Sequence, residues 1–297
     1  MKEILVPAFA KVNLRLEILG RRADGYHELR TIFQSLTLHD SLRLALTRGP
    51  AIELRVEGNP ALAAAPARDN LVYRALSVLR DELKLRRGVA VTLRKRVPAG
   101  RGLGGGSSDA AAALAGLLRL TGKRVAPGRL MEIAASLGAD VPFFLSGGRA
   151  LGVSRGDEIY PLPELPRQTV LIVSPPDIGV NTREAYGWLG RGLTMPPEPH
   201  RLWAFCALCW SPSGVALKND FEAAVFRRHS RLSQIKRRLL QHGAADASLA
   251  GSGSAVFGIF TSPAKARRAA RMFPEDAVFQ CATISRQAYS RALWGLS

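Results

Sequence analysis

Residues 97–114 read VPAGRGLGGGSSDAAAAL, and they place the most flexible part of the chain directly before one of its best helix formers. Five glycines fall within the seven positions 100–106, and Ser107 and Ser108 separate them from an alanine-rich run that begins at Asp109. Glycine has no Cβ atom, so its backbone N–H group can approach a ligand closely. The stretch therefore predicts a ligand-binding loop that leads straight into a helix.

A glycine loop in front of a helix is a binding site for anions, and it suits phosphate. The first turn of a helix has unpaired N–H donors and a partial positive charge, and the loop adds further donors. We expect Ser107 and Ser108 to cap the helix and to donate hydrogen bonds to phosphate oxygens. Two common phosphate loops do not fit: no lysine follows the glycines as in a Walker A loop, and Gly102-x-Gly104-x-x-Ser107 matches the dinucleotide fingerprint only in part.

Length and charge set limits on the class of protein. The chain has 297 residues, enough for two domains, and its net charge of +18 favours anionic partners such as phosphorylated metabolites or nucleic acid. The longest apolar run, residues 110–118, is too short to cross a bilayer, and the N-terminal stretch MKEILVPAFAKVN does not resemble a signal peptide. We therefore expect a cytoplasmic protein with no membrane partner.

The three cysteines do not form a recognisable metal or redox pattern. Cys206 and Cys209 are spaced as CxxC, but they lie in the apolar stretch LWAFCALCW, and neither a second CxxC nor a matching histidine pair accompanies them. We interpret them as core residues of a buried helix.

The rest of the chain mixes strands and helices without a regular βαβ alternation, which favours an α+β fold. Alternation of apolar residues predicts strands over 4–19, 33–46, 52–58, 89–97, 169–175 and 277–285, and hairpins over 149–163 and 247–260. Helices are expected over 71–85, for about a dozen residues after the glycine loop, over 128–140 and 262–273, and two or three times before residue 241. Three prolines within 161–167 mark the start of a second unit.

Three motifs resemble the GHMP kinase superfamily, which includes galacto-, homoserine, mevalonate and phosphomevalonate kinases. PAGRGLGGGSSDAAA (98–112) is similar to its central motif, PAFAKVNLRLEIL (7–19) to its first and SLAGSGSAVFGIF (248–260) to its third. The resemblance implies a ribosomal-protein-S5-like N-terminal domain over 1–160 and a ferredoxin-like α/β domain over 161–297. The active site would lie in the cleft between them.

The resemblance also implies the substrate ATP with Mg²⁺. The nucleotide site would consist of Pro98, Gly100, Gly102, Leu103, Gly104, Gly105, Gly106, Ser107 and Ser108, with Asn70 and Leu71 beside the adenine. The residues alone allow another interpretation of the last two, as a helix N-cap and a core leucine. The protein ligand of Mg²⁺ is unknown; Ser108 and a water-mediated contact are both open.

Two residues are candidates for catalysis. Asp140 follows a helix stop inside the apolar stretch GADVPFF, and Lys11 interrupts an apolar strand. A carboxylate there can accept the proton of an attacking alcohol, and a buried lysine needs a partner and can stabilise phosphoryl charge. Without the resemblance, a turn aspartate is an equally good interpretation of Asp140, and the solvent face of an edge strand is the better interpretation of Lys11. The superfamily resemblance assigns both to the catalytic site.

The segment GRRADGYHELRTIFQSL (20–36) is similar to one branch of the superfamily, as are GADVPFFLSGGRALGVSRGD (138–157) and NDFE (219–222). That branch acts in the non-mevalonate isoprenoid pathway and phosphorylates the 2-hydroxyl of a cytidine diphosphate derivative. The resemblance places Tyr26, His27 and Tyr186 on the cytidine; a packed aromatic and a surface histidine are the other interpretation of the first two. Asn13, two residues after Lys11 and so on the same face of the strand, is expected to orient the substrate.

Two other functions remain open from the sequence. The chain could be another GHMP-type kinase, mevalonate-like or homoserine-like, although the RADGYH segment argues against it. It could instead be a basic nucleic-acid-binding protein whose glycine loop holds a backbone phosphate. The sequence allows either a monomer or a homodimer.

Overall fold

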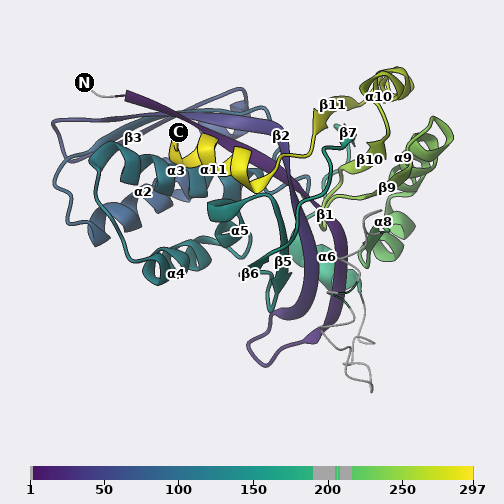
Figure 1. Ribbon diagram of the computed structural model, residues 1–297, viewed down its shortest axis with the longest axis horizontal. Helices are drawn as coiled ribbons and strands as arrows, with labels where there is room; N and C mark the ends of the chain where they lie inside the picture. The colour runs from purple at the N-terminus through teal and green to yellow at the C-terminus, as the bar shows by residue number, and fades with distance from the viewer. Residues whose placement is uncertain (1–2, 190–204, 206, 208–215, 297) are drawn as a thin grey trace.

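The chain forms two β-sheets. The long hairpin of the first two strands belongs to the first sheet and extends from it past the second one (Figure 1). The computed structural model describes residues 3–189, 205, 207 and 216–296. The first sheet has the strand order β3-β4-β2-β1-β8, and the β5–β6 hairpin is added along β2. Its strands are β1 (Glu3–Arg21), β2 (His27–Leu46), β3 (Ile52–Glu57), β4 (Val89–Arg94), β5 (Arg149–Val153), β6 (Glu158–Pro161) and β8 (Lys218–Asn219).

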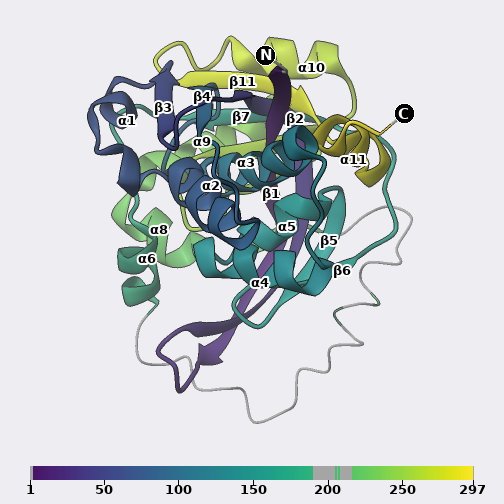
Figure 2. The same cartoon turned by 90° about the vertical axis from the view of Figure 1, so that its left-hand side faces the viewer.

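Helices cover one face of the first sheet (Figure 2). They are α1 (Pro60–Ala64), the short 3₁₀ helix η1 (Ala67–Asp69), α2 (Leu71–Glu82), α3 (Gly105–Thr121), α4 (Pro127–Leu137), α5 (Val141–Ser146) and α11 (Arg286–Trp294). The predicted N-cap of α2 is confirmed, because the Asn70 side chain accepts a hydrogen bond from the amide of Val72.

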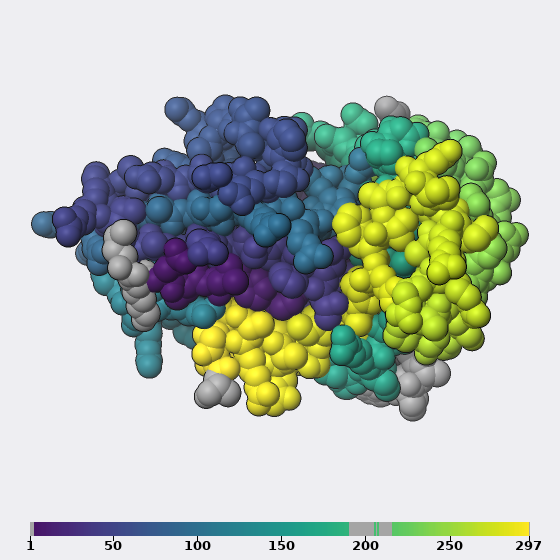
Figure 3. Space-filling view, turned by 90° about the horizontal axis from the view of Figure 1, so that it is seen from above, coloured from purple at the N-terminus to yellow at the C-terminus, as the bar shows by residue number. Residues whose placement is uncertain are grey.

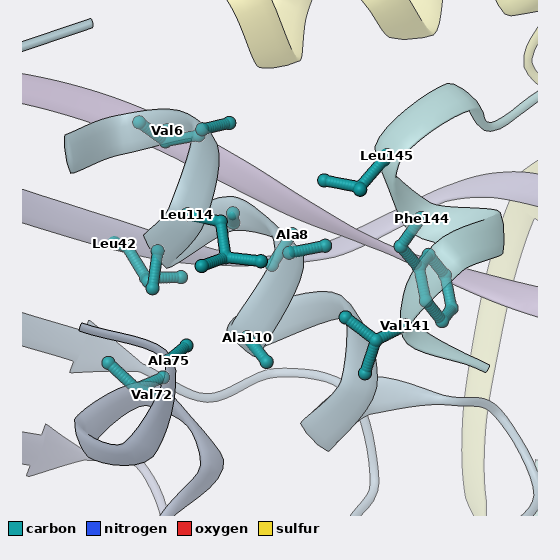
Figure 4. Packing of buried hydrophobic residues seen from close by; sticks show 14 of the residues in the cluster. Val6, Ala8, Leu42, Val72, Ala75, Ala110, Leu114, Val141, Phe144 and Leu145 are labelled. Carbon is teal, nitrogen blue, oxygen red and sulfur yellow. The ribbon is translucent and has the colours of Figure 1, made fainter. Parts of the chain in front are cut away.

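Helix α3, which follows the glycine loop, lies at the centre of this layer. It is longer than the dozen residues we expected, and it ends at Gly122 in the left-handed conformation, a common helix stop. Its alanines at 110–113 are fully buried, and their small side chains let β1, α2 and α5 approach closely, as Figure 4 shows for Ala110 and Leu114 among Ala8, Val72 and Val141. The glycine loop is therefore attached to a helix that the core holds firmly.

The second sheet has the antiparallel order β11-β7-β10-β9, with strands β7 (Thr169–Ser174), β9 (Asp246–Leu249), β10 (Val256–Phe260) and β11 (Ala277–Ala282). Helices α6 (Thr182–Trp188), α8 (Glu222–Arg228) and α9 (Ser230–Gln241) lie between β7 and β9 in the chain, and α10 (Pro263–Ala270) lies between β10 and β11. This βαββαβ connectivity with its strand order is ferredoxin-like, as predicted. The α+β class is confirmed as well.

The last helix returns to the first domain, which the sequence analysis did not predict. Tyr289 and Leu293 of α11 belong to the core around α3, and the Tyr289 hydroxyl donates a hydrogen bond to the carbonyl of Phe144 at 2.7 Å. Figure 3 shows C-terminal residues, in yellow, both beside the purple first strand and over the second domain. The boundary between 160 and 161 stays a prediction; it falls at the end of β6, before the chain enters the second sheet.

Two further expectations concern the cysteines and membrane spans. Cys206 and Cys209 lie outside the residues that the structure describes, so their interpretation as core residues stays a prediction. Over the described part of the chain, none of the helices is both long and apolar enough to span a bilayer.

Candidate active site

A cavity of about 1480 Å³ lies between the two domains. The first domain contributes residues of β1, the glycine loop and Asp140, and the second contributes α6 and the turn at residues 251–253. All the site residues predicted from the sequence line this cavity except Asn70 and Ser108. The prediction of a cleft between two domains is therefore confirmed.

The glycine loop needs its glycines for two reasons. Gly100, Gly102 and Gly104 have φ values of +68°, +79° and +71°, a region that other residues adopt only with strain. There is also no room for side chains: a Cβ on Gly104 would lie 2.6 Å from the Phe144 ring, and a Cβ on Gly102 would collide with the carbonyl oxygen of Ala250. The loop is thus packed between the first core and the second domain.

The expectation that serines cap α3 is wrong. The N-cap residue is Gly104, which has no capping side chain, and Ser107 and Ser108 lie inside the first turn. The first helical hydrogen bond runs from the amide of Ser108 to the carbonyl of Gly104, so the amides of Gly105, Gly106 and Ser107 have no partner within the helix. These three residues line the cavity. The donors that face the cavity here are therefore main-chain amides and the Ser107 hydroxyl, while Ser108 is buried.

A buried charge cluster of Asp40, Lys95 and Asp109 supports the start of α3. The Lys95 ammonium donates to Asp109 at 2.7 Å and to Asp40, and Asp40 also accepts the amide of Val97 at 2.8 Å. All three side chains are at most 4% exposed. Burial alone would lower the pKa of Lys95, but the charges of Asp109 and Asp40 raise it above its ordinary value, so the lysine stays cationic.

The sequence analysis missed this cluster, although a signal was present. Lys95 stands between Arg94 and Arg96, a local pattern that is typical of an exposed basic patch. In the alternation of the strand, however, Lys95 falls on the side that faces the core, in line with the buried residues Val89, Val91 and Leu93. Asp109 was seen only as the start of the alanine run, and nothing in its own neighbourhood indicated a buried partner.

Lys11 and Asp140 form an ion pair in the lining of the cavity. The Lys11 ammonium lies 3.5 Å from the Asp140 carboxylate and donates to the Asn13 side chain at 2.7 Å. Asn13 in turn donates to the Thr31 hydroxyl at 2.7 Å. Lys11 is 5% exposed at its side chain, and Asp140 is 33% exposed. This arrangement leaves the carboxylate open to a substrate while the lysine is held in place.

The local structure of each element explains these positions. The pairing of β1 with β2 is irregular on both sides of Lys11 and Asn13, between Phe9 and Lys11 and between Asn13 and Arg15. Such bulges turn side chains out of the regular pleat and are common beside active sites. Asp140 ends the turn after α4, and its carboxylate caps no amide of α5, so it is available for chemistry.

The residues predicted to bind cytidine, Tyr26, His27 and Tyr186, all line the cavity. The His27 and Tyr186 rings are stacked, with centroids 4.4 Å apart and planes 17° from parallel. Tyr26 lies beside them, 56% exposed, with the Arg155 guanidinium 4.8 Å from its ring centroid. Burial, and secondarily the charge of Arg21, lowers the pKa of His27, and burial with the charge of Asp140 raises the pKa of Tyr186 to about 12. Both rings are therefore neutral at pH 7.

The cavity is strongly basic, which the sequence analysis did not resolve residue by residue. Its described lining includes one carboxylate, that of Asp140, against the cations of Lys11, Arg21, Arg101, Arg155 and Arg183. A surface of this kind favours polyanionic ligands. Arg101 donates to the Ser254 hydroxyl at 2.7 Å and to the Pro176 carbonyl at 3.1 Å.

Models of known families match both halves of the chain. The GHMP kinases N terminal domain matches residues 70–148, and the GHMP kinases C terminal domain matches residues 202–278. Together with the fold and the glycine loop at the start of α3, these matches define the class of the protein as a GHMP kinase.

Individual proteins narrow the class further. A 4-diphosphocytidyl-2-C-methyl-D-erythritol kinase of Solibacter usitatus is 44% identical over 292 residues, which cover 97% of this chain and 90% of that protein. The crystal structure of a 4-(cytidine 5'-diphospho)-2C-methyl-D-erythritol kinase matches with a TM-score of 0.78 and 34% identity, covering 95% of this chain and 99% of that one. A homoserine kinase of Cytophaga hutchinsonii, with a TM-score of 0.72, 19% identity and coverage of 96% and 95%, shares the fold. The chain belongs to the 4-diphosphocytidyl-2-C-methyl-D-erythritol kinase family.

Proposed function

We propose that this chain transfers the γ-phosphoryl group of ATP to the 2-hydroxyl of 4-diphosphocytidyl-2-C-methyl-D-erythritol, giving the 2-phosphate and ADP, in the non-mevalonate isoprenoid pathway. One observation carries the proposal: a single basic cavity holds the glycine loop, the Lys11–Asp140 pair and the stacked rings of His27 and Tyr186. These three parts suit a triphosphate, an attacking alcohol and a pyrimidine, respectively.

The residues of the cavity support direct transfer with no covalent intermediate. Main-chain amides of Gly105, Gly106 and Ser107 would hold the phosphates, and Asp140 would accept the proton of the substrate hydroxyl. Lys11 lies beside Asp140, where it would stabilise the charge on the transferred group. Catalysis then consists of positioning and charge stabilisation.

The lining also fits a Mg²⁺ ion carried on the phosphates. Mg²⁺ usually keeps several waters and takes few protein oxygens, and the loop hydroxyl that lines the cavity is that of Ser107. Ser108, our earlier candidate, is buried with its Oγ unpaired and lies outside the lining. When bound, the ion neutralises phosphate charge. Over the described residues, no group of three or more His, Cys, Asp and Glu side chains forms a metal site of its own.

An assay of ADP release with three acceptors tests the proposal. We expect turnover with 4-diphosphocytidyl-2-C-methyl-D-erythritol and none above background with mevalonate or homoserine, because the latter two offer no ring to His27 and Tyr186 and no diphosphate to the arginines. Turnover with mevalonate or homoserine alone would instead support another GHMP-type kinase. Salt-sensitive binding of oligonucleotides without ATP turnover would support the nucleic-acid-binding alternative.

Replacement of His27 by alanine tests the cytidine end of the cavity. We expect His27→Ala to raise the KM for the cytidine substrate by about tenfold, because a stacked aromatic contact is worth about 1–3 kcal/mol per base, and to change kcat by much less. The KM for ATP serves as the internal control and should stay unchanged. A fall in kcat with an unchanged KM for the cytidine substrate would contradict this role.

The pH dependence of the same KM follows from the charge of His27. Burial lowers the pKa of His27 below its ordinary value of 6.5, so the ring binds a proton only when the pH falls below that value. If the neutral ring holds the cytosine, the KM should be flat from pH 7 to pH 8.5 and should rise at lower pH; His27→Ala should remove that rise.

We propose a cytoplasmic location for this reaction, because ATP is the phosphoryl donor. Sedimentation of the purified chain distinguishes a monomer from a homodimer.

A further inference from the structure

The segment NDFE, residues 219–222, has no role in the chemistry described above. It begins in β8, which pairs in parallel with β1 opposite Arg15 and Leu16. The strand β1 also carries Lys11 and Asn13, a few residues earlier. The segment therefore connects the strand of the catalytic lysine to the second domain.

Asn219 donates both hydrogen bonds of its side-chain nitrogen to the end of β9 and the turn that follows it. It is 5% exposed, and its Nδ2 donates to the carbonyl of Gly251 at 2.7 Å and to that of Leu249 at 2.9 Å. Its Oδ1 accepts the amide of Phe221 at 3.0 Å. A buried amide with all these bonds formed fixes the backbone at the start of the turn.

The turn at residues 251–253 is packed directly on the glycine loop and Lys11. A Cβ on Gly253 would collide with the carbonyl carbon of Arg101, and one on Gly251 would lie 3.4 Å from the Lys11 ammonium. On the loop side, a Cβ on Gly102 would collide with Ala250. Contact between backbones leaves no side chain to absorb a shift, so a displaced turn must displace the loop or Lys11.

The same elements reach the helix that carries Tyr186. The Phe221 ring meets the Tyr186 ring edge-on, with centroids 4.9 Å apart and planes at 79°. The Ser252 hydroxyl is hydrogen-bonded to that of Thr182, the first residue of α6, at 2.9 Å. The segment and the turn thus contact both the glycine loop and helix α6 with its Tyr186.

We infer that Asn219 is a positioning residue, which sets the turn at 251–253 against the glycine loop and Lys11. Asn219 does not line the cavity, and it acts through the backbone of Gly251. The inference rests on the proposed function only where turnover is measured, because that assay needs the cytidine substrate. The binding of ADP is measured without an acceptor.

The variant Asn219→Asp tests this role. Aspartate keeps the oxygen that accepts the Phe221 amide, but it places a second oxygen against the carbonyls of Leu249 and Gly251, where the amide donates now. We expect calorimetry to show a Kd for ADP that is about tenfold higher, and kinetics to show a kcat that is about tenfold lower. The KM for the cytidine substrate should change by less than about threefold, because the Phe221–Tyr186 contact is retained.

Glu222→Gln is the matched control in the same segment. Glu222 accepts the Ser248 hydroxyl at 2.9 Å and the Leu249 amide at 3.0 Å, and it pairs with Lys236 at 2.6 Å. Glutamine keeps the accepting oxygen and removes the ion pair. We expect a lower Tm with an unchanged Kd for ADP and an unchanged kcat.

A second variant covers the case in which Asn219→Asp does not fold. Ser254→Ala removes the hydroxyl that anchors Arg101 at the other end of the turn, and Ser254 lies outside the cavity lining. The Kd for ADP should rise in the same direction by about threefold. The inference is wrong if Asn219→Asp lowers the Tm but leaves the Kd for ADP and the kcat at wild-type values. If Asn219→Asp is insoluble, the inference is wrong when Ser254→Ala leaves the Kd for ADP unchanged. A wild-type chain that binds ADP but does not phosphorylate the cytidine substrate contradicts the proposed function alone.

Discussion

We expect Asp140→Asn to lower kcat by about 10²–10⁴-fold, the contribution typical of a positioned general base. Asparagine has the shape of aspartate and can still accept a hydrogen bond from Lys11, which lies 3.5 Å from the carboxylate. It cannot take the proton of the attacking hydroxyl. Since the carboxylate caps no helix amide, its replacement should leave the local backbone in place. The measurement is ADP release at saturating concentrations of both substrates.

Binding measurements separate chemistry from assembly of the site in this variant. The Kd for ADP should match that of the wild type, because the amides of Gly105, Gly106 and Ser107 are unchanged. Asp81→Asn, which changes a carboxylate that is 73% exposed on α2, should keep full kcat. If Asp140→Asn retains more than about a tenth of wild-type kcat, the carboxylate positions Lys11 or the substrate but does not act as the base.

Much of the fold and of the site could be predicted from the sequence, because local rules determine those parts. The alternation of residues 4–19 predicted β1, and the same period placed Lys11 and Asn13 on one face, where their side chains now form a hydrogen bond. Glycines before an alanine-rich run predicted a loop that leads straight into a helix, and this loop lines the cavity. The motif resemblance then selected Asp140 against an equally good local interpretation and His27 against a better one, and both residues line the cavity.

The remaining features depend on contacts between residues far apart in the chain, which local patterns do not show. The C-terminal helix α11 is stabilised by packing of Tyr289 and Leu293 on the first core. Asn219 acts on Gly251, and Asp40 pairs with Lys95, more than fifty residues away. The prediction of serine caps is wrong for a local reason. Gly104, in the left-handed conformation, is the N-cap residue of α3 and lies three residues before Ser107.

The buried cluster under the glycine loop leads to the largest expected change in stability. We expect Lys95→Met to lower the free energy of unfolding by about 3–5 kcal/mol, measured by urea unfolding. Methionine fills a similar volume but removes the cation between Asp40 and Asp109, and both carboxylates are almost fully buried. Asp40 would keep its bond from the Val97 amide, whereas Asp109, one of whose oxygens is already unpaired, would lose its partner.

Two comparisons distinguish this cause from a general loss of packing. Lys95→Met combined with Asp109→Asn should be more stable than Lys95→Met alone, because the amide removes the unpaired buried charge. Arg129→Met, which breaks exposed ion pairs to Glu82 and Glu132, should change stability far less. Simple addition of the two single effects in the double variant would contradict the account.

Because a Cβ on Gly105 would lie 3.3 Å from the Lys95 ammonium, Lys95→Met should also weaken ADP binding, whereas Arg129→Met should not.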